Sequence, residues 1–419
     1  MRIGYVCHTY LVDFHYKTLQ AKTLSKETFF SVVKHNLEVL QKQMEYNVEQ
    51  DIQFQRITSD LIPFASSPLC PLDWKVEFVE TLQSIGSYIF RHGLRVSMHP
   101  GQYTILNSPI DKVVKQSIAE LQYHADLLDT LGLDSTHKIV LHLGGMYGDK
   151  TMAIQRFCRR FARLSESVKR RLILENDDLH YSLEDVMFVH KKINIPIVFD
   201  ILHHQICPSY PDLSLSEILR MVHQTWKQGD GVPKLHYSEQ ARMKRIGVHA
   251  RTIHAEPFSA FIHQLQETKL DFDIMLEVRD KNLSVLKAKD LLNPCKMAAL
   301  ETTWASYKYE VLAREPLIYQ AIRELLKDKN QCPIFPFYFL LENALQSIMT
   351  KNHFNNAFSH MMGYLSNQAT AIEKMKYTQI IESPEDNPEQ LNKALMWLYR
   401  KAEKYQVKYL LQQTIFLHL

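Results

Sequence analysis

The chain has 419 residues, of which 46% are hydrophobic and 23% charged, a composition typical of globular rather than disordered or fibrous proteins. Its net charge of +3 is too small to indicate a nucleic-acid partner by itself. No run of about 18 apolar residues occurs, so we expect no membrane span. The six cysteines are too scattered to predict a disulfide framework, and a cytoplasmic location is expected.

Two strands and two helices are predicted in the first part of the chain. Residues 2–7 predict a strand, and apolar residues at helical spacing predict a helix at 27–48. The segment 52–57 alternates between apolar and polar residues, as a half-buried strand does, and a helix is expected at 73–91.

Six further strands are predicted by short apolar runs of the kind found in buried parallel sheets. Each run ends in a residue type that binds metals: His99, His142, Glu175, Asp200, His236 and Glu277. A strand, a helix and their loops need about 30 residues or more, which matches the separation of these positions. The helices expected after these strands lie at 112–131, 151–169, 182–192, 214–227, 257–267 and 281–291.

Eight alternating strand and helix units favour an α/β fold in which a parallel sheet closes into a (β/α)₈ TIM barrel. A doubly wound open sheet is the alternative, but it collects ligand-binding residues from only a few strands. After Asn293 and Pro294 the patterns are helical. We therefore expect a barrel domain over residues 1–295 and a C-terminal all-α domain over residues 296–419.

The metal-type side chains should meet, because the carboxyl ends of barrel strands open on one face. His203 lies three residues after Asp200 and is a further candidate, whereas His249 in a later loop is a weaker one. Mixed imidazole and carboxylate ligands suit Mn²⁺, Fe²⁺ or Zn²⁺ better than Mg²⁺. Paired ions would activate water and clamp the oxygens of a phosphate displacement. The simpler alternatives are a salt bridge at Glu175 and structural histidines.

Basic residues near the same face are candidates for phosphate contacts. Lys234 lies two residues before His236 and therefore faces the same side of its strand, where it would orient a phosphate, stabilise charge or be solvated. The loop after that strand contains four more basic residues: Arg242, Lys244, Arg245 and Arg251.

Over about residues 1–290 the chain resembles the UV damage endonuclease (UvdE/UvsE) family. The motifs that carry the resemblance are Gly4-Tyr5, Arg56-Ile57-Thr58-Ser59, His99-Pro100-Gly101-Gln102-Tyr103, His142-Leu143-Gly144-Gly145, Leu174-Glu175-Asn176-Asp177-Asp178, Phe199-Asp200-Ile201-Leu202-His203-His204, Pro233-Lys234-Leu235-His236, Ser238-Glu239-Gln240 and Met275-Leu276-Glu277. The resemblance implies a (β/α)₈ barrel that binds a cluster of divalent metals. Two or three Mn²⁺ ions are expected, with Zn²⁺ or Mg²⁺ as alternatives.

The resemblance also implies roles for single residues. Lys234 matches a carboxylated active-site lysine, and we expect it to act in catalysis with Glu175 and Glu277. Gln102 and Tyr103 match a pair that wedges into the duplex opposite the lesion. DNA contacts are further expected at Tyr5, Lys244 and Arg245. The implied metal ligands are His99, His142, Glu175, Asp200, His203, His236, His249 and Glu277.

One position departs from the family pattern, and the tail resembles a different family. Ser67 stands where the family commonly has a histidine, so one ion would lose a ligand. Residues from about 300 to 419 resemble the YbgA-type domain of unknown function, which implies no chemistry. The motifs that carry this second resemblance are Lys308-Tyr309-Glu310-Val311-Leu312-Ala313, the stretch from Asn355 through His360 to Gly363-Tyr364-Leu365, and Tyr409-Leu410-Leu411-Gln412-Gln413.

The expected function is DNA repair by nicking of duplex DNA immediately 5′ to a UV photoproduct, through attack of a metal-bound hydroxide on the phosphodiester. An abasic-site endonuclease of the endonuclease IV type, or a sugar isomerase on a similar barrel, is the alternative enzyme. A damage-binding protein whose catalysis is weakened by Ser67 is the alternative from another class. We expect a monomer that acts on UV-damaged double-stranded DNA without a nucleotide cofactor.

Overall fold

The structure is a computed structural model that describes residues 1–12, 14–293, 296–383 and 387–418. Contacts between Cα atoms divide the chain into two compact units. The first comprises Met1–Thr9, Phe14–Ile253 and Ala260–Leu286, and the second comprises Tyr10–Asp13, His254–Ser259 and Lys287–Leu419. The limits of the two domains expected from the sequence stay a prediction.

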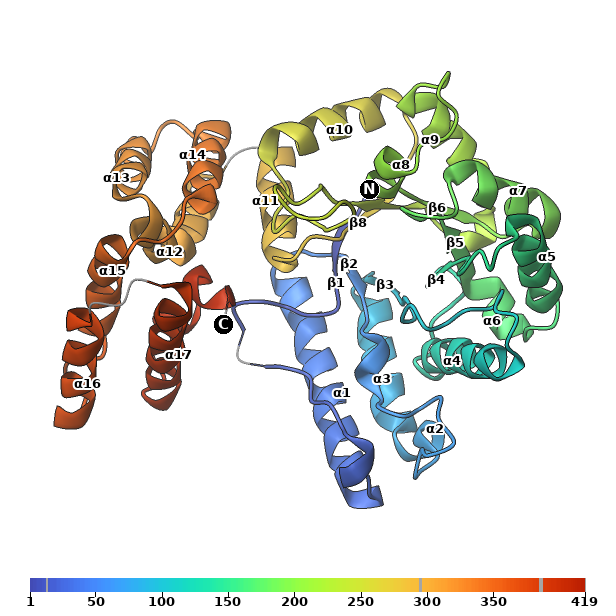
Figure 1. The fold of residues 1–419 in the computed structure, drawn as a ribbon, viewed down its shortest axis with the longest axis horizontal. Helices are drawn as coiled ribbons and strands as arrows, with labels where there is room; N and C mark the ends of the chain where they lie inside the picture. The colour runs from blue at the N-terminus through green and yellow to red at the C-terminus, as the bar shows by residue number, and fades with distance from the viewer. Residues whose placement is uncertain (13, 294–295, 384–386, 419) are drawn as a thin grey trace. The chain divides into compact units, whose positions relative to one another are not determined.

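The first unit is built on eight parallel strands among the described residues (Figure 1). Their order in the sheet is β3-β2-β1-β8-β7-β6-β5-β4, and a parallel bridge between Met98 and Ile139 joins the two ends of that order. The sheet is therefore closed, and the predicted (β/α)₈ barrel is confirmed. The strands are β1 Ile3–Val6, β2 Phe54–Arg56, β3 Arg95–Ser97, β4 Ile139–His142, β5 Leu172–Glu175, β6 Ile197–Asp200, β7 Lys234–Tyr237 and β8 Asp273–Leu276.

Helices lie outside the barrel strands (Figure 1). Two segments predicted as single helices are each broken in two: 73–91 at Phe78, where ψ is 15°, and 151–169 before Ser165, which caps a new helix by accepting from Val168 N–H. The helices up to residue 292 are α1 Lys26–Glu49, α2 Trp74–Glu77, α3 Val79–Arg91, α4 Asp111–Thr130, α5 Lys150–Phe161, α6 Glu166–Arg171, α7 Leu183–Ile193, α8 Ile201–Ile206, α9 Leu215–His223, α10 Ala255–Glu267 and α11 Asn282–Leu292.

Alternation along the strands places the metal-type side chains inside the barrel. An apolar layer in the interior is formed by two clusters: Val6, Phe54 and Met275, and Val140, Ile173, Val198 and Trp226. Two positions further along five of these strands stand Arg56, His142, Glu175, Asp200 and Glu277. Because side chains two apart face the same way, these polar groups form the next layer, at the carboxyl ends of the strands.

The second unit is helical and has its own apolar core, formed mainly from α12, α15 and α17. Cys332 is disulfide-bonded, which the scattered cysteines did not predict. Within the described part of the chain, no helix has the length and apolar character that crossing a membrane requires. The helices of this part are α12 Met297–Arg314, α13 Pro316–Leu325, α14 Ile334–Gln346, α15 Lys351–Gly363, α16 Ala371–Glu382, α17 Pro388–Lys404 and α18 Lys408–Leu411.

Candidate metal centre

Glu175, the last residue of β5, is the centre of the polar layer. Its side chain is 1% exposed, and four histidine rings surround it. Oε2 lies 3.2 Å from His99 Nε2 and 3.5 Å from His142 Nε2, whereas Oε1 lies 2.6 Å from His236 Nδ1. Burial raises the pKa of Glu175, but the charges and hydrogen bonds of the imidazoles outweigh it and hold that pKa well below its usual range. The carboxylate is therefore available as an anionic ligand.

Asp200 and His203 meet at the end of β6 because the strand passes directly into α8. Asp200 caps this helix by accepting from the His203 N–H through Oδ1 at 2.8 Å, while Oδ2 is buried without a hydrogen-bond partner. His203 Nδ1 lies 3.8 Å from Asp200 Oδ1 and 2.9 Å from the Asn176 carbonyl. Burial raises the pKa of Asp200 to about 8. A cation beside the unpartnered Oδ2 would offset this cost.

Arg56, at the end of β2, is a cation within the same layer that the sequence pattern missed. Its Nη2 donates to Glu277 Oε1 and lies 3.2 Å from His236 Nε2. Glu277 Oε1 is in turn 3.0 Å from His236 Nδ1. Arg56 and His236 therefore balance much of the charge on Glu277.

Three groups of potential ligand atoms can each hold a metal ion, and Glu175 belongs to all of them. In each group one atom per residue lies within 4.8 Å of the others: His99, His142 and Glu175; Glu175, Asp200 and His203; and Glu175, His236 and Glu277. Two buried atoms of these residues have no hydrogen-bond partner, namely His142 Nδ1 and Asp200 Oδ2. Mixed nitrogen and oxygen donors with unsatisfied buried atoms fit a cluster of divalent transition-metal ions.

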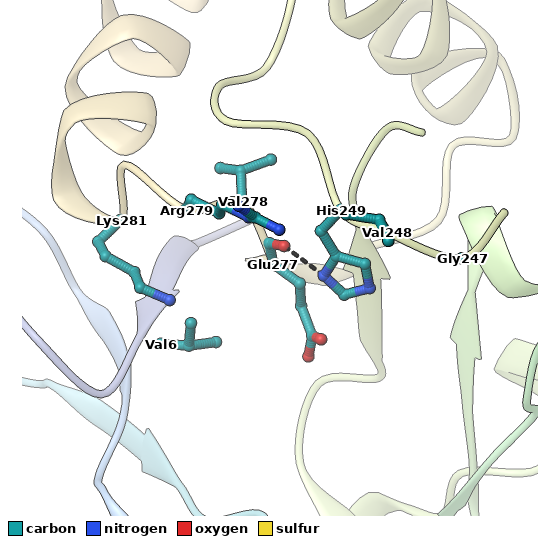
Figure 2. Close-up of a pocket in the computed structure, with 8 residues that line it drawn as sticks. All are labelled: Val6, Gly247, Val248, His249, Glu277, Val278, Arg279 and Lys281. Carbon is teal, nitrogen blue, oxygen red and sulfur yellow. Dashed lines mark hydrogen bonds between the residues drawn. The ribbon is translucent and has the colours of Figure 1, made fainter. Parts of the chain in front are cut away.

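His249 lies beside the metal centre but in none of the three groups. Its Nδ1 is 2.6 Å from the Glu277 carbonyl oxygen, which only accepts, so Nδ1 donates in this contact. Both residues line an open pocket of about 440 Å³ (Figure 2). The remaining lining residues are Val6, Gly247, Val248, Val278, Arg279 and Lys281.

The chain is similar to known protein families and to known proteins, in sequence and in structure. The family described as UV-endonuclease UvdE matches residues 1–304, and Protein of unknown function (DUF1722) matches residues 308–418. A UV DNA damage endonuclease of Clostridium perfringens (strain 13 / Type A) is 35% identical over 408 residues, which is 96% of both chains. This chain belongs to the UV-endonuclease UvdE family.

Two further UvdE relatives agree with this assignment. A UV DNA damage endonuclease of Bacillus cereus (strain G9842) is 31% identical over 305 residues, covering 70% of this chain and 95% of that one. The crystal structure of SacUVDE aligns with a TM-score of 0.65 and 39% identity, covering 70% of this chain and 100% of that one. The expected family, barrel fold and enzyme class are confirmed, and the tail belongs to a family without a described function.

Lys234, which the UvdE resemblance singles out, is enclosed inside the barrel. Its side chain is 1% exposed; Nζ donates to Ser97 Oγ at 3.1 Å and lies 5.5 Å from the centre of the Phe54 ring. Burial and the charge of Arg56 hold the pKa of Lys234 well below its usual range. This burial contradicts the solvated lysine that was one alternative from the sequence. A role of Lys234 in orienting a phosphate or stabilising charge stays a prediction.

Four residues expected to contact DNA are exposed, and one is not. Gln102, Lys244 and Arg245 are exposed, and Tyr103 is 63% exposed with its hydroxyl 3.5 Å from Glu120 Oε1. Tyr5, by contrast, is fully buried.

The expected DNA contact of Tyr5 is therefore wrong for this structure. Its neighbours on β1, Gly4 and Val6, face the barrel interior, so alternation turns Tyr5 outward beneath α1. There its hydroxyl lies 2.7 Å from Thr9 Oγ1 and donates to Asn47 Oδ1 at 2.8 Å. A ring with no exposed surface and a bonded hydroxyl cannot contact a nucleotide.

Ser67 lies in the segment after β2 and belongs to none of the three ligand groups. Its hydroxyl accepts from the Leu69 N–H at 3.2 Å, which makes it part of a local turn. The three groups are nevertheless present without a histidine at this position.

Proposed function

We propose that this chain is a metal-dependent DNA repair endonuclease that nicks duplex DNA immediately 5′ to UV photoproducts. The observation that carries the proposal is the set of three ligand groups that share Glu175 on the open face of the barrel. Membership of the UvdE family and relatives named UV DNA damage endonuclease support it. The reaction is hydrolysis of one phosphodiester bond, which leaves a 3′-hydroxyl and a 5′-phosphate.

The candidate ligands have different roles according to their positions in the site. Glu175 would be the shared ligand, because its two oxygens face different histidines. Asp200 and Glu277 would each complete a further group with it. When bound, divalent ions supply a nucleophile from water near neutral pH and stabilise charge on the phosphate oxygens. His249 would be a further ligand through Nε2, since its Nδ1 faces the Glu277 carbonyl oxygen. Mn²⁺ suits the mixture of imidazole and carboxylate, with Zn²⁺ or Mg²⁺ as alternatives.

Lys234 takes part as a carbamate. The lowered pKa leaves a neutral amine, whose lone pair forms a C–N bond to CO₂ with loss of one proton. The resulting carboxylate would replace a neutral amine by an anion next to His236, two residues along the same strand. This change of charge favours divalent ions in the cluster.

Recognition of the lesion falls to the exposed residues of two loops. Gln102 and Tyr103 fill the space left when damaged nucleotides leave the duplex, and stacking on an aromatic ring contributes about 1–3 kcal/mol per base. Lys244 and Arg245 contact backbone phosphates, since both are exposed in the loop after β7. Displacing damaged nucleotides costs a few kcal/mol, and less where pairing is already weak.

The test is a nicking assay on supercoiled plasmid with Mn²⁺. We expect the wild type to nick irradiated plasmid, EDTA to abolish the activity, and primer extension to map the nick to the 5′ side of the photoproduct. Nicking that survives EDTA would contradict the metal mechanism. Equal cutting of plasmid with abasic sites would favour an abasic-site endonuclease, and tight binding without nicking at any metal tested would favour a damage-binding protein.

A further inference from the structure

Lys281 has a strained backbone in the turn between β8 and α11. Its φ is 54°, in the left-handed region that side chains other than glycine rarely adopt. Glycine at this position would remove the strain, yet the chain has a lysine. Strained residues of this kind are enriched at functional sites. Because they also occur elsewhere in this chain, the surroundings of the side chain decide whether it has a role.

The side chain of Lys281 lines the pocket beside the metal centre. Figure 2 shows it extending from the turn toward Val6 and the side of the pocket that holds the Glu277 carboxylate. The pocket is open and has a volume of about 440 Å³, which is within the range of about 300–1,000 Å³ of small-ligand sites. Lys281 therefore presents its amino group to the pocket that Glu277 and His249 also line.

This ammonium has no carboxylate within salt-bridge distance in the described part of the chain. Glu277, which lines the same pocket, is paired with Arg56, and its Oε1 lies 3.0 Å from His236 Nδ1. Arg279 lines the same pocket and adds a second cation. A partly buried cation without an anionic partner, in an open pocket, is a site for an anion.

We propose that Lys281 binds a phosphate of the DNA backbone in this pocket and so holds the strand beside the metal centre. This inference rests on the proposed function, because it takes duplex DNA as the ligand. The contact is to a phosphate oxygen, so it positions the strand and is independent of base sequence and of the lesion. Lys281 is a positioning residue rather than a catalytic one.

The experiment compares Lys281→Met with Lys269→Met. Lys269 has nearly the same backbone, with φ of 57°, but it is exposed and precedes β8, at the opposite end of the barrel from the metal centre. Binding to an unirradiated duplex is measured by fluorescence anisotropy over a range of KCl concentrations. Nicking of irradiated plasmid with Mn²⁺ is measured in parallel, and bound manganese is counted.

One lost phosphate contact should lower the slope of log affinity against log salt by about 0.9, and affinity near 0.1 M KCl by roughly tenfold. We expect this for Lys281→Met, with a raised KM, an unchanged manganese content and partial rescue in Lys281→Arg. Lys269→Met should match the wild type. Lys281→Gly and Lys269→Gly should both raise Tm, which separates backbone strain from the phosphate contact.

Equal salt slopes and KM values for Lys281→Met and wild type would overturn the proposal. A wild type that binds duplex with the full slope but never nicks irradiated DNA would overturn the proposed function instead. In that case a reduced slope in Lys281→Met would still support the phosphate contact, because binding to unirradiated duplex reports on it directly.

Discussion

Glu175 belongs to all three groups of potential metal ligands. We therefore expect its replacement to weaken metal binding more than replacement of any residue that belongs to one group. In Glu175→Gln one oxygen becomes an amide NH₂, which donates instead of accepting and faces imidazole nitrogens at 2.6–3.2 Å. We expect manganese content to fall and nicking of irradiated plasmid to drop by about 10²–10³-fold, as when one preorganised electrostatic group is removed from an active site. Circular dichroism should show the wild-type fold. Full manganese content with wild-type nicking would contradict the bridging role.

Arg56 should weaken metal binding, because it places a positive charge beside two potential ligands, His236 and Glu277. Arg56→Gln should lower the Tm of the metal-free protein, because breaking a buried ion pair costs about 3–5 kcal/mol. It should also increase the rise in Tm that Mn²⁺ produces, because an ion no longer meets the charge of Arg56.

The control for this change is Arg95→Gln, which breaks the buried pair between Arg95 and Asp273, 2.8 Å apart at the amino end of the strands. It should lower Tm without altering the effect of Mn²⁺. A smaller Mn²⁺ effect in Arg56→Gln than in the wild type would show that Arg56 orients Glu277 for the metal rather than opposing it.

The sequence predicted which potential metal ligands lie close together, but not the arginine that contacts two of them. Residues at the ends of parallel strands converge whatever their separation along the chain, so the seven ligand candidates in the three groups were accessible from the pattern. Arg56 occupies an equivalent strand end, two positions after the buried Phe54, but an arginine is not a metal ligand and was passed over. The predicted DNA contact of Tyr5 was wrong because it came from family resemblance alone. Alternation along β1 turns this side chain out of the barrel interior.

The loop between β7 and α10 is the element that positions His249, Lys244 and Arg245. It folds back on itself through a bridge between Gln240 and His249, and it turns at Gly247, whose φ is 86°. A Cβ added to Gly247 would overlap the Asp178 carboxylate.

Gly247→Ala should therefore shift this loop and lower nicking activity, with a loss of about 1–3 kcal/mol in stability from backbone strain. Gly148→Ala is the matched control, because its φ is 80° and nothing lies within 4 Å of the added Cβ. It should lose similar stability and keep its activity. Equal activities in the two variants, measured on irradiated plasmid, would show that the geometry of this loop does not matter.

Helices and strands were predicted best where an apolar pattern continues over a long stretch of sequence. Strands and helix positions followed from apolar patterns, but breaks depended on local backbone geometry that periodicity does not encode. Phe78 interrupts one predicted helix without a proline or glycine to mark it. The short helix α8 was not predicted. The sequence marks its start only by the N-cap residue Asp200, which was interpreted solely as a metal ligand.

Stability of the whole molecule should depend on pH through His137, buried at the amino end of the barrel. The Val96 N–H donates to His137 Nδ1 at 3.1 Å, and burial lowers the pKa of His137 to about 4. The unfolded chain, with a pKa near 6.5, then binds more protons between pH 6.5 and 4. The contribution of His137 is therefore complete above pH 6.5 and is lost as pH falls toward 4.

Chemical unfolding in EDTA checks this dependence. Relative to His137→Gln, the wild type should lose about 2 kcal/mol of unfolding free energy between pH 7.5 and 5, at about 1.4 kcal/mol per pKa unit. Parallel pH curves for the two proteins would show that the imidazole stays protonated in the fold or titrates normally.

The end of the strand pattern near residue 293 predicts a second domain, whose limits stay a prediction. The compact units of the structure are interleaved, because Tyr10–Asp13 and His254–Ser259 group with the C-terminal helices. The function of the tail was not predicted, because none of the three potential metal-ligand groups found among the described residues lies in it. The barrel differs in this respect, since its topology gathers ligands from six strands at one face.

Anomalous diffraction from crystals grown with Mn²⁺ tests most directly whether these ligands share ions. Data collected at the manganese edge should show two or three peaks, each within about 2.0–2.3 Å of ligand atoms, with Glu175 bound to more than one of them. Peaks that avoid Glu175, or none inside the barrel at saturating Mn²⁺, would contradict the shared metal centre.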